Sequence, residues 1–419
     1  MDKIIITGGK KLKGSIKISG SKNSALPILF ATLLTDEKCK INNVPTLADI
    51  KTTIDFLNFI GKPTTKNKNT VIADKSTKLN HIAPYDLVRK MRASVLVMGP
   101  LIARLGKVDV SLPGGCAIGA RPIDIHLDAF KQMGANIELK EGYVKVSAEN
   151  GLKGADIEFR FASVGATENV LLASVLAKGT TRIINAAKEP EIVDLADMLV
   201  KMGAKISGAG TKIITVEGVE KLLGCSHNVI ADRIETATYM IATAITKGDV
   251  TLKNTNPQHL QTVTDKLTES GLSIKITDDE IRVKWIKDLK PINIKTEIYP
   301  GFPTDIQAQW MALMCIVKGN SIVEETVFEN RFLHVGELQR FGADIRIDGN
   351  SVYISGVDEL SGAPVMVSDL RAGAALVLAG LCAHGKTEVL RIYHLDRGYE
   401  TLEKKLRKLG ANIKRVKVK

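Results

Sequence analysis

Apolar and polar positions along the chain repeat one phrase, in which an amphipathic run ends in glycine and an alternating stretch follows. The phrase occurs six times, as FLNFIGKPTT, FKQMGANIEL, LVKMGAKIS, LTESGLSIKI, LQRFGADIRI and LRKLGANIKR. Its glycines are Gly61, Gly134, Gly203, Gly271, Gly342 and Gly410, about 70 residues apart. Such a glycine is typical of a helix that ends in a left-handed cap, and the alternation predicts a strand. The sequence therefore predicts six copies of one structural unit.

Each repeat predicts the same series of elements. After the glycine comes a hairpin, as in residues 135–148 and 343–356, whose turns carry Gly or Asn. A third alternating strand follows, as in 155–161 and 364–369, and leads into a nearly all-apolar helix. Helices that are apolar on all sides are buried ones. A short strand and a second, amphipathic helix complete a unit of the α-β-α-β-β type.

The two ends of the chain do not match this unit. The chain begins with two strands, KIIITG and GSIKISG, and its last repeat stops after one strand, NIKRVKV. We therefore expect residues 1–21 to complete the sixth unit. This predicts an α/β protein of two similar three-unit domains, one at 22–229 and the other made of 1–21 and 230–419. The chain would cross between them near residues 21 and 230, which form a hinge.

Composition places the chain among globular proteins without a membrane segment. Of 419 residues 44% are hydrophobic and 25% charged, and no run of 18 apolar residues occurs. The start, MDKIIITGGKKLKG, has no signal-peptide pattern. Five widely spaced cysteines without metal-ligand spacing indicate reduced thiols. We expect a cytoplasmic protein that has no membrane partner.

The formal net charge of +12 permits anionic partners, from nucleic acid to phosphate esters and carboxylates. Aromatic residues make up only 5% of the chain and no RNP-like strand motif occurs, which argues against base stacking on a sheet. There is neither a cluster of metal ligands nor a Rossmann glycine fingerprint in the sequence. We therefore expect no metal and no cofactor.

The stretch LPGGCAIGARPID combines a thiol, several glycines and a cation. Cys116 lies among three glycines, and Arg121 follows five positions later. Glycines let a backbone move or approach a ligand closely, and a fixed cation favours the thiolate. We expect residues 112–122 to form a mobile loop with a reachable, ionisable thiol. The alternative is a surface turn with an incidental cysteine.

Polar residues mark the six points where a third strand leads into a buried helix. They are Lys22 with Asn23, Arg92, the run Ser163-Val164-Gly165, Arg233, Asp305, and Asp369 with Arg371. A helix N-terminus offers free N–H groups and favours anions. Asn, Ser and Asp are also ordinary N-caps, but Lys and Arg there oppose the helix dipole. The cations thus favour sites for phosphate or carboxylate groups.

Six motifs in order resemble those of the UDP-N-acetylglucosamine enolpyruvyl transferases (1-carboxyvinyltransferases). They are SKNSALP at 21–27, PGGCAIGARPID at 113–124, SVGATEN at 163–169, PGFPTDIQAQ at 300–309, SDLRAGAA at 368–375 and IYHLDRGYE at 392–400. The resemblance covers the whole chain. It implies an inside-out α/β barrel of two similar domains with the active site in the cleft between them.

The resemblance also implies a reaction. Such enzymes transfer the enolpyruvyl group of phosphoenolpyruvate to the 3-hydroxyl of UDP-N-acetylglucosamine by addition and elimination, and release phosphate. This is the first committed step of peptidoglycan synthesis, hence of cell wall formation, cell shape and division. It implies two small-molecule substrates, no nucleic-acid partner and, as we expect, a monomer.

Site residues follow from the same resemblance. The catalytic set is Cys116, Asp305, Lys22 and Arg397, with Asp305 accepting the hydroxyl proton and Cys116 acting as the acid that fosfomycin alkylates. Phosphoenolpyruvate is expected at Lys22, Asn23, Arg121, Arg371 and Arg397. The nucleotide sugar is expected at Arg92, Arg121, Pro122, Ile123, Asp124, Ile125, Ser163, Val164, Asp305 and Val327. Asp369 is expected nearby as a structural residue.

One departure and three alternatives stay open at this point. Some relatives carry a Lys two residues before Ser163, where this chain has Phe161, and alternation predicts that Arg160 faces the opposite side of its strand. The sister enolpyruvyl transferase acts on shikimate 3-phosphate, but it lacks the loop cysteine. An RNA-terminal phosphate cyclase would need a catalytic histidine, and none of the seven stands in a motif for it. A non-enzymatic nucleic-acid binder is the third alternative.

Overall fold

The computed structural model describes residues 2–76, 78–89, 91–111 and 123–417. These form two compact units, the split unit of residues 2–19 and 231–417 and the continuous unit of residues 20–111 and 123–230. Each unit has its own hydrophobic core. Within the described residues, no helix has both the length and the apolar character needed to cross a membrane.

The continuous unit contains seven α-helices and twelve strands among its described residues. The helices are α1 (Lys22–Ala31), α2 (Ala48–Ile60), α3 (Tyr85–Val88), α4 (Met98–Leu105), α5 (Asp124–Gln132), α6 (Val164–Ser174) and α7 (Pro190–Lys201), with 3-10 helices η1 (Thr32–Leu34) and η2 (Arg92–Val97). The strands are β3 (Cys39–Asn42), β4 (Thr64–Asn67), β5 (Thr70–Ala73), β6 (Ile82–Ala83), β7 (Lys107–Ser111), β8 (Asn136–Lys140), β9 (Tyr143–Ser147), β10 (Asp156–Glu158), β11 (Thr180–Ile184), β12 (Lys205–Ser207), β13 (Ile213–Glu217) and β14 (Ser226–Asn228).

The split unit has the same kinds of element. Its helices are α8 (Arg233–Ile245), α9 (Gln261–Ser270), α10 (Gln307–Met314), α11 (Val335–Gln339), α12 (Leu370–Cys382) and α13 (Leu402–Lys408), with 3-10 helices η3 (Pro257–Leu260), η4 (Thr304–Ile306) and η5 (Ile392–Arg397). Its strands are β1 (Asp2–Thr7), β2 (Lys13–Lys17), β15 (Asp249–Lys253), β16 (Ser273–Ile276), β17 (Glu280–Lys284), β18 (Ile294–Lys295), β19 (Asn320–Glu324), β20 (Asp344–Asp348), β21 (Ser351–Ser355), β22 (Pro364–Met366), β23 (Lys386–Leu390) and β24 (Asn412–Lys417).

The described strands form six four-stranded sheets with one common pattern, which confirms the repeat. Each sheet has an edge strand parallel to its neighbour and then two antiparallel strands. The orders are β14-β3-β5-β4, β6-β7-β9-β8, β10-β11-β13-β12, β2-β15-β17-β16, β18-β19-β21-β20 and β22-β23-β1-β24. The six repeat glycines all have positive φ, from 87° at Gly134 to 115° at Gly271. Only glycine adopts this conformation readily, so the predicted caps are confirmed.

Both strands predicted at the start of the chain are present, but they belong to different sheets. β1 lies between β23 and β24 in the last sheet, as expected. β2 instead pairs in parallel with β15, in the sheet of the fourth repeat. The expectation that residues 1–21 complete the sixth unit is therefore wrong for β2. In each sheet, the parallel edge strand comes just before a buried helix in the sequence. Only β2 and β14 are followed by a helix of the other unit, because the chain passes from one unit to the other there.

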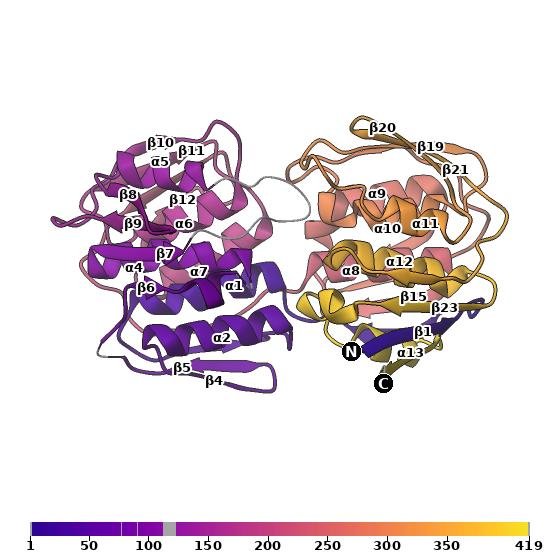
Figure 1. Ribbon diagram of the computed structural model, residues 1–419, viewed down its shortest axis with the longest axis horizontal. Coiled ribbons are helices and arrows are strands. Elements are labelled where there is room, and N and C mark those ends of the chain that lie inside the picture. The colour runs from indigo at the N-terminus through magenta and orange to yellow at the C-terminus, as the bar shows by residue number, and fades with distance from the viewer. Residues whose placement is uncertain (1, 77, 90, 112–122, 418–419) are drawn as a thin grey trace. The chain divides into compact units, whose positions relative to one another are not determined.

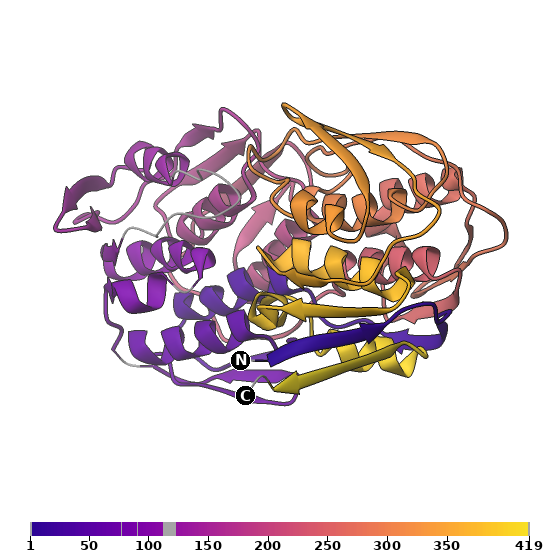
Figure 2. The same cartoon turned by 45° about the vertical axis from the view of Figure 1, so that its right-hand side comes forward.

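Buried helices occupy the inside of each unit, and the sheets lie outside them (Figure 1). In the split unit α8, α10 and α12 pack against one another, and every residue of α10 is buried. In the continuous unit α4 packs against α6, and α1 contacts η2, the turn that leads into α4. The second view shows the sheet of β1, β23 and β24 covering one side of α12 (Figure 2). This is the inside-out α/β arrangement that the family resemblance implied.

Candidate active site

Asp305 lies between two buried arginines of the split unit. It belongs to η4, immediately before α10. Nη2 of Arg331 donates to its Oδ1, and Nη2 of Arg371 donates to its Oδ2, both at 2.8 Å. The arginine side chains are 4% and 5% exposed, whereas that of Asp305 is 27% exposed. A carboxylate has about four lone-pair sites, so the two arginine contacts do not exhaust the acceptors of Asp305.

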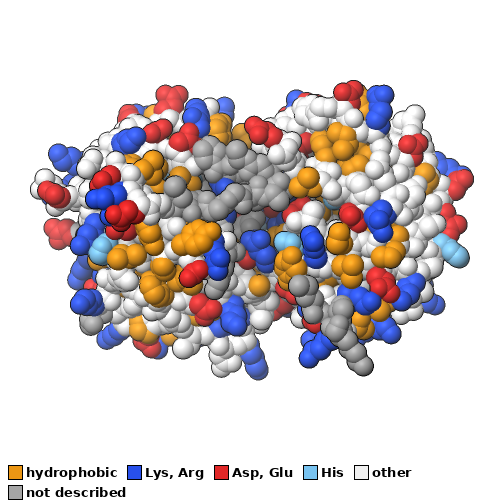
Figure 3. Space-filling view, in the orientation of Figure 1, with side chains coloured by type: hydrophobic (Ala, Val, Ile, Leu, Met, Phe, Trp, Pro, Cys, Tyr) orange, Lys and Arg blue, Asp and Glu red, His pale blue; other side chains and the backbone are white. Residues whose placement is uncertain are grey.

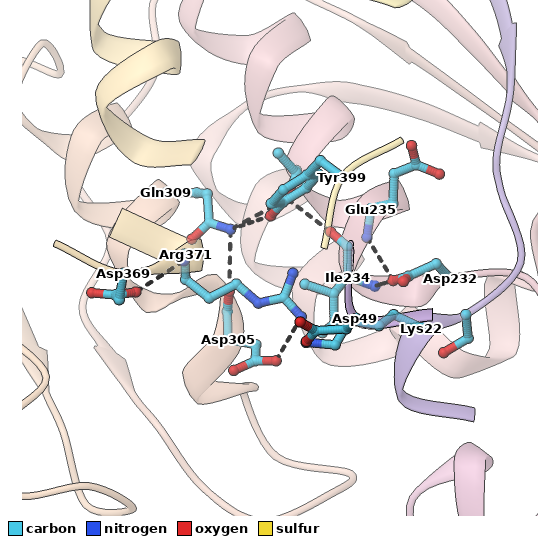
Figure 4. Close-up of polar contacts among 12 residues, drawn as sticks. Lys22, Asp49, Asp232, Ile234, Glu235, Asp305, Gln309, Asp369, Arg371 and Tyr399 are labelled. Atoms are coloured by element: carbon cyan, nitrogen blue, oxygen red, sulfur yellow. Dashed lines mark hydrogen bonds and ion pairs between the residues drawn. The ribbon is translucent and has the colours of Figure 1, made fainter. Parts of the chain in front are cut away.

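Arg371 is positioned by the start of α12. Asp369 is the N-cap of this helix, and its Oδ1 accepts from the N–H groups of Arg371 and Ala372 at 2.9 and 3.1 Å. Figure 4 shows the Arg371 side chain extending from this turn toward Asp305. Burial by itself lowers the pKa of the Arg371 guanidinium, but the charge of Asp305 and the contact with Tyr399 raise it on balance. Arg371 is therefore a permanent cation.

A buried polar network supports the other side of Arg371. The guanidinium lies 5.5 Å from the centre of the Tyr399 ring. Nε2 of Gln309 donates to Tyr399 Oη and to the backbone oxygen of Asp305, both at 3.1 Å (Figure 4). The Tyr399 hydroxyl is also 2.9 Å from Thr238 Oγ1. Burial raises the pKa of Tyr399, which stays a neutral phenol. The network thus ties α8, α10 and α12 together beneath Asp305 and Arg371.

Glu325 organises the loop that carries Val327. Its carboxylate is 3% exposed and accepts from the hydroxyls of Thr296 and Thr304 at 2.8 Å. It also accepts from the N–H of Val327 at 2.8 Å and from that of Phe328 at 3.1 Å. Thr304 precedes Asp305 directly, so one buried carboxylate fixes the backbone around both Asp305 and Val327.

Histidines beside these groups are neutral. Burial lowers the pKa of His334 to about 4, with Asp369 acting against the shift and Arg331 adding to it. Burial also lowers the pKa of His394, to which the charge of Arg397 contributes. Arg397 ends η5, which packs against α12. The split unit therefore brings together Asp305, Asp369 and Arg371, with Arg397 on a neighbouring element.

The continuous unit presents Lys22 and Asn23 at the first turn of α1. Ser21 caps this helix, and its Oγ accepts from the N–H of Ser24 at 3.3 Å. Lys22 Nζ lies 3.1 Å from Oδ2 of Asp49, and the two side chains are 12% and 4% exposed. A buried, paired ammonium is held in place, because separating it from its carboxylate would leave an uncompensated buried charge.

Residues expected at the nucleotide lie at three helix starts of the same unit. Arg92 begins η2, Ile123 precedes α5, and Asp124 and Ile125 are the first two residues of α5. Ser163 caps α6, of which Val164 is the first residue, and its Oγ accepts from the N–H of Ala166 at 3.4 Å.

Arg160 differs from its predicted placement. It forms an ion pair with Oδ2 of Asp124. β10 ends at Glu158, so the alternation that predicted an opposite facing does not extend to Arg160. Oδ1 of Asp124 is buried and has no hydrogen-bond partner. Phe161 is 53% exposed. The carboxylate of Asp124 thus has one oxygen held by Arg160 and one available as an acceptor.

Some predicted residues cannot be placed, and some observed ones were not predicted. Cys116, Arg121 and Pro122 lie outside the described residues. Gln309 and Tyr399 fall inside the sequence motifs but carried no predicted role. Arg331, Glu325 and Asp49 were missed, since a buried charge in a loop or on a helix face leaves no local sequence signal. In the described part of the chain, no group of three or more His, Cys, Asp or Glu residues could hold a metal ion.

Comparisons with known proteins agree over the full length. The family model for EPSP synthase (3-phosphoshikimate 1-carboxyvinyltransferase) matches residues 6–406. The UDP-N-acetylglucosamine 1-carboxyvinyltransferase of Endomicrobium trichonymphae is 70% identical and covers 99% of both chains. That of Geotalea uraniireducens is 55% identical over 99% of this chain and 100% of its own.

Solved structures show the same fold. The enolpyruvyl transferase NikO from Streptomyces tendae superposes with a TM-score of 0.90 at 24% identity and covers 100% of this chain and 99% of its own. EPSP synthase from Acinetobacter baumannii gives a TM-score of 0.78 at 19% identity, with both chains covered completely.

Proposed function

This chain belongs to the EPSP synthase family of enolpyruvyl transferases, and we propose on that premise that it acts on UDP-N-acetylglucosamine. The reaction transfers the enolpyruvyl group of phosphoenolpyruvate to the 3-hydroxyl of the sugar and releases phosphate. The observation that carries this proposal is the full-length likeness to curated enzymes of that name. The same likeness does not favour the shikimate enzyme. The activity would serve peptidoglycan synthesis, in a cytoplasmic monomer.

Phosphoenolpyruvate carries about three negative charges near neutral pH, which several fixed cations must balance. Lys22, Arg371 and Arg397 are proposed for this role, with Asn23 and with Arg121 of the loop. Arg371 suits it because its guanidinium is buried, permanently charged and held by Asp305 and Tyr399. A guanidinium binds carboxylate or phosphate through two parallel hydrogen bonds, which fixes the orientation of the anion.

Asp305 is proposed as the base of the addition step. The sugar 3-hydroxyl adds to C2 of phosphoenolpyruvate, its proton passes to the carboxylate, and a proton is delivered to C3. Loss of phosphate and of a C3 proton then gives the enolpyruvyl product. The two arginine contacts support this role, because they fix the carboxylate and leave it 27% exposed. Cys116 is proposed as the acid at C3 and as the nucleophile that fosfomycin alkylates.

The nucleotide sugar is proposed to lie along Arg121, Pro122, Ile123, Asp124 and Ile125, near Arg92. The partner-free Oδ1 of Asp124 can accept from the N3–H of uracil. The diphosphate is proposed at Ser163 and Val164, where the start of α6 offers N–H groups. Val327, held by Glu325, is proposed to contact the sugar with Asp305.

Phosphate release measured with two acceptors tests the function directly. The purified chain and phosphoenolpyruvate are assayed with UDP-N-acetylglucosamine and, in parallel, with shikimate 3-phosphate. We expect release only with the nucleotide sugar. Release with shikimate 3-phosphate alone would assign the sister activity, and no release with either would overturn enolpyruvyl transfer. On the face in Figure 3, Lys and Arg are interspersed with Asp and Glu over each unit, which gives no support to a nucleic-acid binder.

A further inference from the structure

His126 lies in the first turn of α5 with one edge of its ring against the start of α6. A Cβ added to Gly165 would lie 3.4 Å from His126 Cε1 and 3.7 Å from Nε2. The side chain is 7% exposed, and the atom with no described partner is Nε2. A buried ring therefore directs one unpartnered nitrogen toward the N-terminus of a helix of eleven residues.

Asn169 decides which ring nitrogen carries the proton. Its Oδ1 accepts from the N–H of Gly99 at 2.7 Å, and its Nδ2 donates to the backbone oxygen of Val95 at 3.1 Å. The amide orientation is fixed by these two bonds. Nδ2 also lies 3.0 Å from Nδ1 of His126, which must therefore accept. A neutral imidazole that accepts at Nδ1 carries its proton at Nε2.

The ring is also neutral. Burial lowers the pKa of His126 to about 4, the charge of Arg92 lowers it further, and Asp124 acts in the opposite direction. Near neutral pH, Nε2 is thus an N–H donor without a positive charge. Its donation does not change with pH across the physiological range.

The first turn of α6 presents further donors at the same place. The Oγ of Ser163 already accepts from Ala166, and its backbone oxygen accepts from Thr167. The N–H groups of Val164 and Gly165 precede the first intrahelical acceptor and have no partner among the described residues. Two backbone donors and the Nε2–H of His126 therefore lie beside one another at the start of α6, an arrangement that suits an anionic oxygen.

We infer that His126 binds the diphosphate of the nucleotide substrate, as a neutral donor whose tautomer Asn169 fixes. The inference rests on the proposed function and adds a residue to it. A neutral donor suits this place because Arg92 already supplies positive charge, and a second buried cation would be repelled by it. The donor also discriminates, since a substrate without the phosphate oxygen would leave this N–H without a partner.

Two substitutions separate the donor from the shape of the side chain. His126→Leu keeps a buried apolar side chain but removes the N–H, and His126→Gln supplies an amide N–H near the position of Nε2. We expect titration calorimetry to show about tenfold weaker UDP binding for His126→Leu and recovery to within about threefold of wild type for His126→Gln. Inorganic phosphate should compete only weakly, because the site is built for the nucleotide. His384→Gln, at an exposed position of the split unit, is the matched control.

Steady-state kinetics give the readout that a purely structural role would not produce. For His126→Leu, KM for UDP-N-acetylglucosamine should rise about tenfold, with kcat and KM for phosphoenolpyruvate within about twofold of wild type. Unchanged UDP affinity, or a loss of kcat alone, would overturn the inference. If UDP binding weakens in His126→Leu but the wild-type protein releases no phosphate from phosphoenolpyruvate, the proposed function is overturned and the role of His126 stands.

Nitrogen NMR on the wild-type protein tests the tautomer without any risk of misfolding. The His126 signals, assigned by their absence from the His126→Gln spectrum, should show protonated Nε2 and unprotonated Nδ1. UDP should shift the Nε2 signal. A proton on Nδ1, or an Nε2 signal indifferent to UDP, would contradict the inference.

Discussion

At the scale of single residues, the candidate site depends on charges that hold one another. Asp305 keeps two buried guanidiniums in place, and they in turn orient its carboxylate. Asp305, Arg331 and Arg371 together carry one net positive charge. An anionic substrate would balance this charge. Removing any one member therefore changes both the local structure and the affinity for the anion.

Replacing the carboxylate separates these effects. Asp305→Asn keeps the side-chain volume but removes the base and one charge, so kcat should fall at least about a hundredfold. Unfolding in urea should show a loss of about 1–3 kcal/mol, because two buried guanidiniums lose their counter-charge. Asp344→Asn, on the exposed edge of β20, is the control and should change neither quantity. An Asp305→Asn protein with activity near that of the wild type would show that Asp305 is not the base of the proposed mechanism.

The cysteines predict a selective alkylation. Burial raises the pKa of Cys315 and of Cys382 to about 12, so these thiols remain protonated and unreactive near neutral pH. The hydrogen bond with Cys225 lowers the pKa of Cys39 to about 7, but Cys39 is 0% exposed and therefore out of reach of the inhibitor. Mass spectrometry after incubation with fosfomycin and UDP-N-acetylglucosamine should show one added inhibitor mass, at Cys116. Cys116→Ser should acquire none. Modification at another cysteine, or persistent activity without an adduct, would contradict the assignment.

Buried histidines predict a loss of stability in acid. His334 has its pKa lowered to about 4 in the folded state, whereas it titrates near 6.5 when unfolded. Between these values the unfolded chain binds more protons, so stability is present above pH 6.5 and lost as the pH falls toward 4. From pH 7.5 to 5, His334 should account for about 2 kcal/mol of lost unfolding free energy. Urea titrations of wild type and His334→Leu at both pH values measure this difference. An equal pH dependence in both proteins would refute it.

At the scale of elements, glycine decides how closely α12 approaches η5. A Cβ on Gly373 would lie 2.7 Å from Val367 Cγ1 and 2.9 Å from Leu395 Cγ. Leu395 belongs to η5, which also carries Arg397. The contact therefore sets the distance between the helix that presents Arg371 and the turn that presents Arg397.

Gly373→Ala should push these two elements apart. We expect a loss of about 1–3 kcal/mol in unfolding free energy, typical of overpacking, and a higher KM for phosphoenolpyruvate. Gly336→Ala is the matched control, because Gly336 is helical and an added Cβ would meet nothing within 4 Å. It should be neutral or stabilising by up to about 1 kcal/mol. A Gly373→Ala protein with unchanged stability would show that η5 adjusts freely.

The elements also show what could be predicted from sequence. Glycine caps, alternation and apolar helices are local signals, and they predicted the six units and the strands β1 and β2. The sheet that β2 joins depends on pairing with β15, more than 200 residues away, which no local signal encodes. The same reason explains why the contacts of Arg331, Asp49 and Arg160 were missed. Asp305, Asp369 and Arg371 were predicted because they stand in motifs at helix starts.

At the scale of the whole molecule, the two units differ in how the chain builds them. All described strands of the three sheets in the continuous unit come from one uninterrupted part of the sequence, β3 to β14. The split unit needs β1 and β2 in addition to everything after residue 231. Two of its three sheets, β2-β15-β17-β16 and β22-β23-β1-β24, each contain one strand from the start of the chain.

Separate fragments should therefore behave differently. Residues 20–230 should fold alone and unfold cooperatively, whereas 231–419 should not, because two of its sheets each lack a strand. A longer fragment, in which a short linker joins residue 419 of 231–419 to residues 1–19, should fold. The linker can be short because Asp2 pairs with Lys417 in the β1–β24 ladder. Circular dichroism during urea unfolding of the three proteins measures this. Cooperative unfolding of 231–419 by itself would refute the dependence on β1 and β2.

The position of β1 has a consequence for synthesis on the ribosome. β1 emerges long before β23 and β24, the two strands between which it lies, and at usual elongation rates the interval is tens of seconds. During that time its apolar face and both of its backbone edges have no native partner. Nascent chains of this protein would therefore require protection from intermolecular strand pairing until their last residues are made.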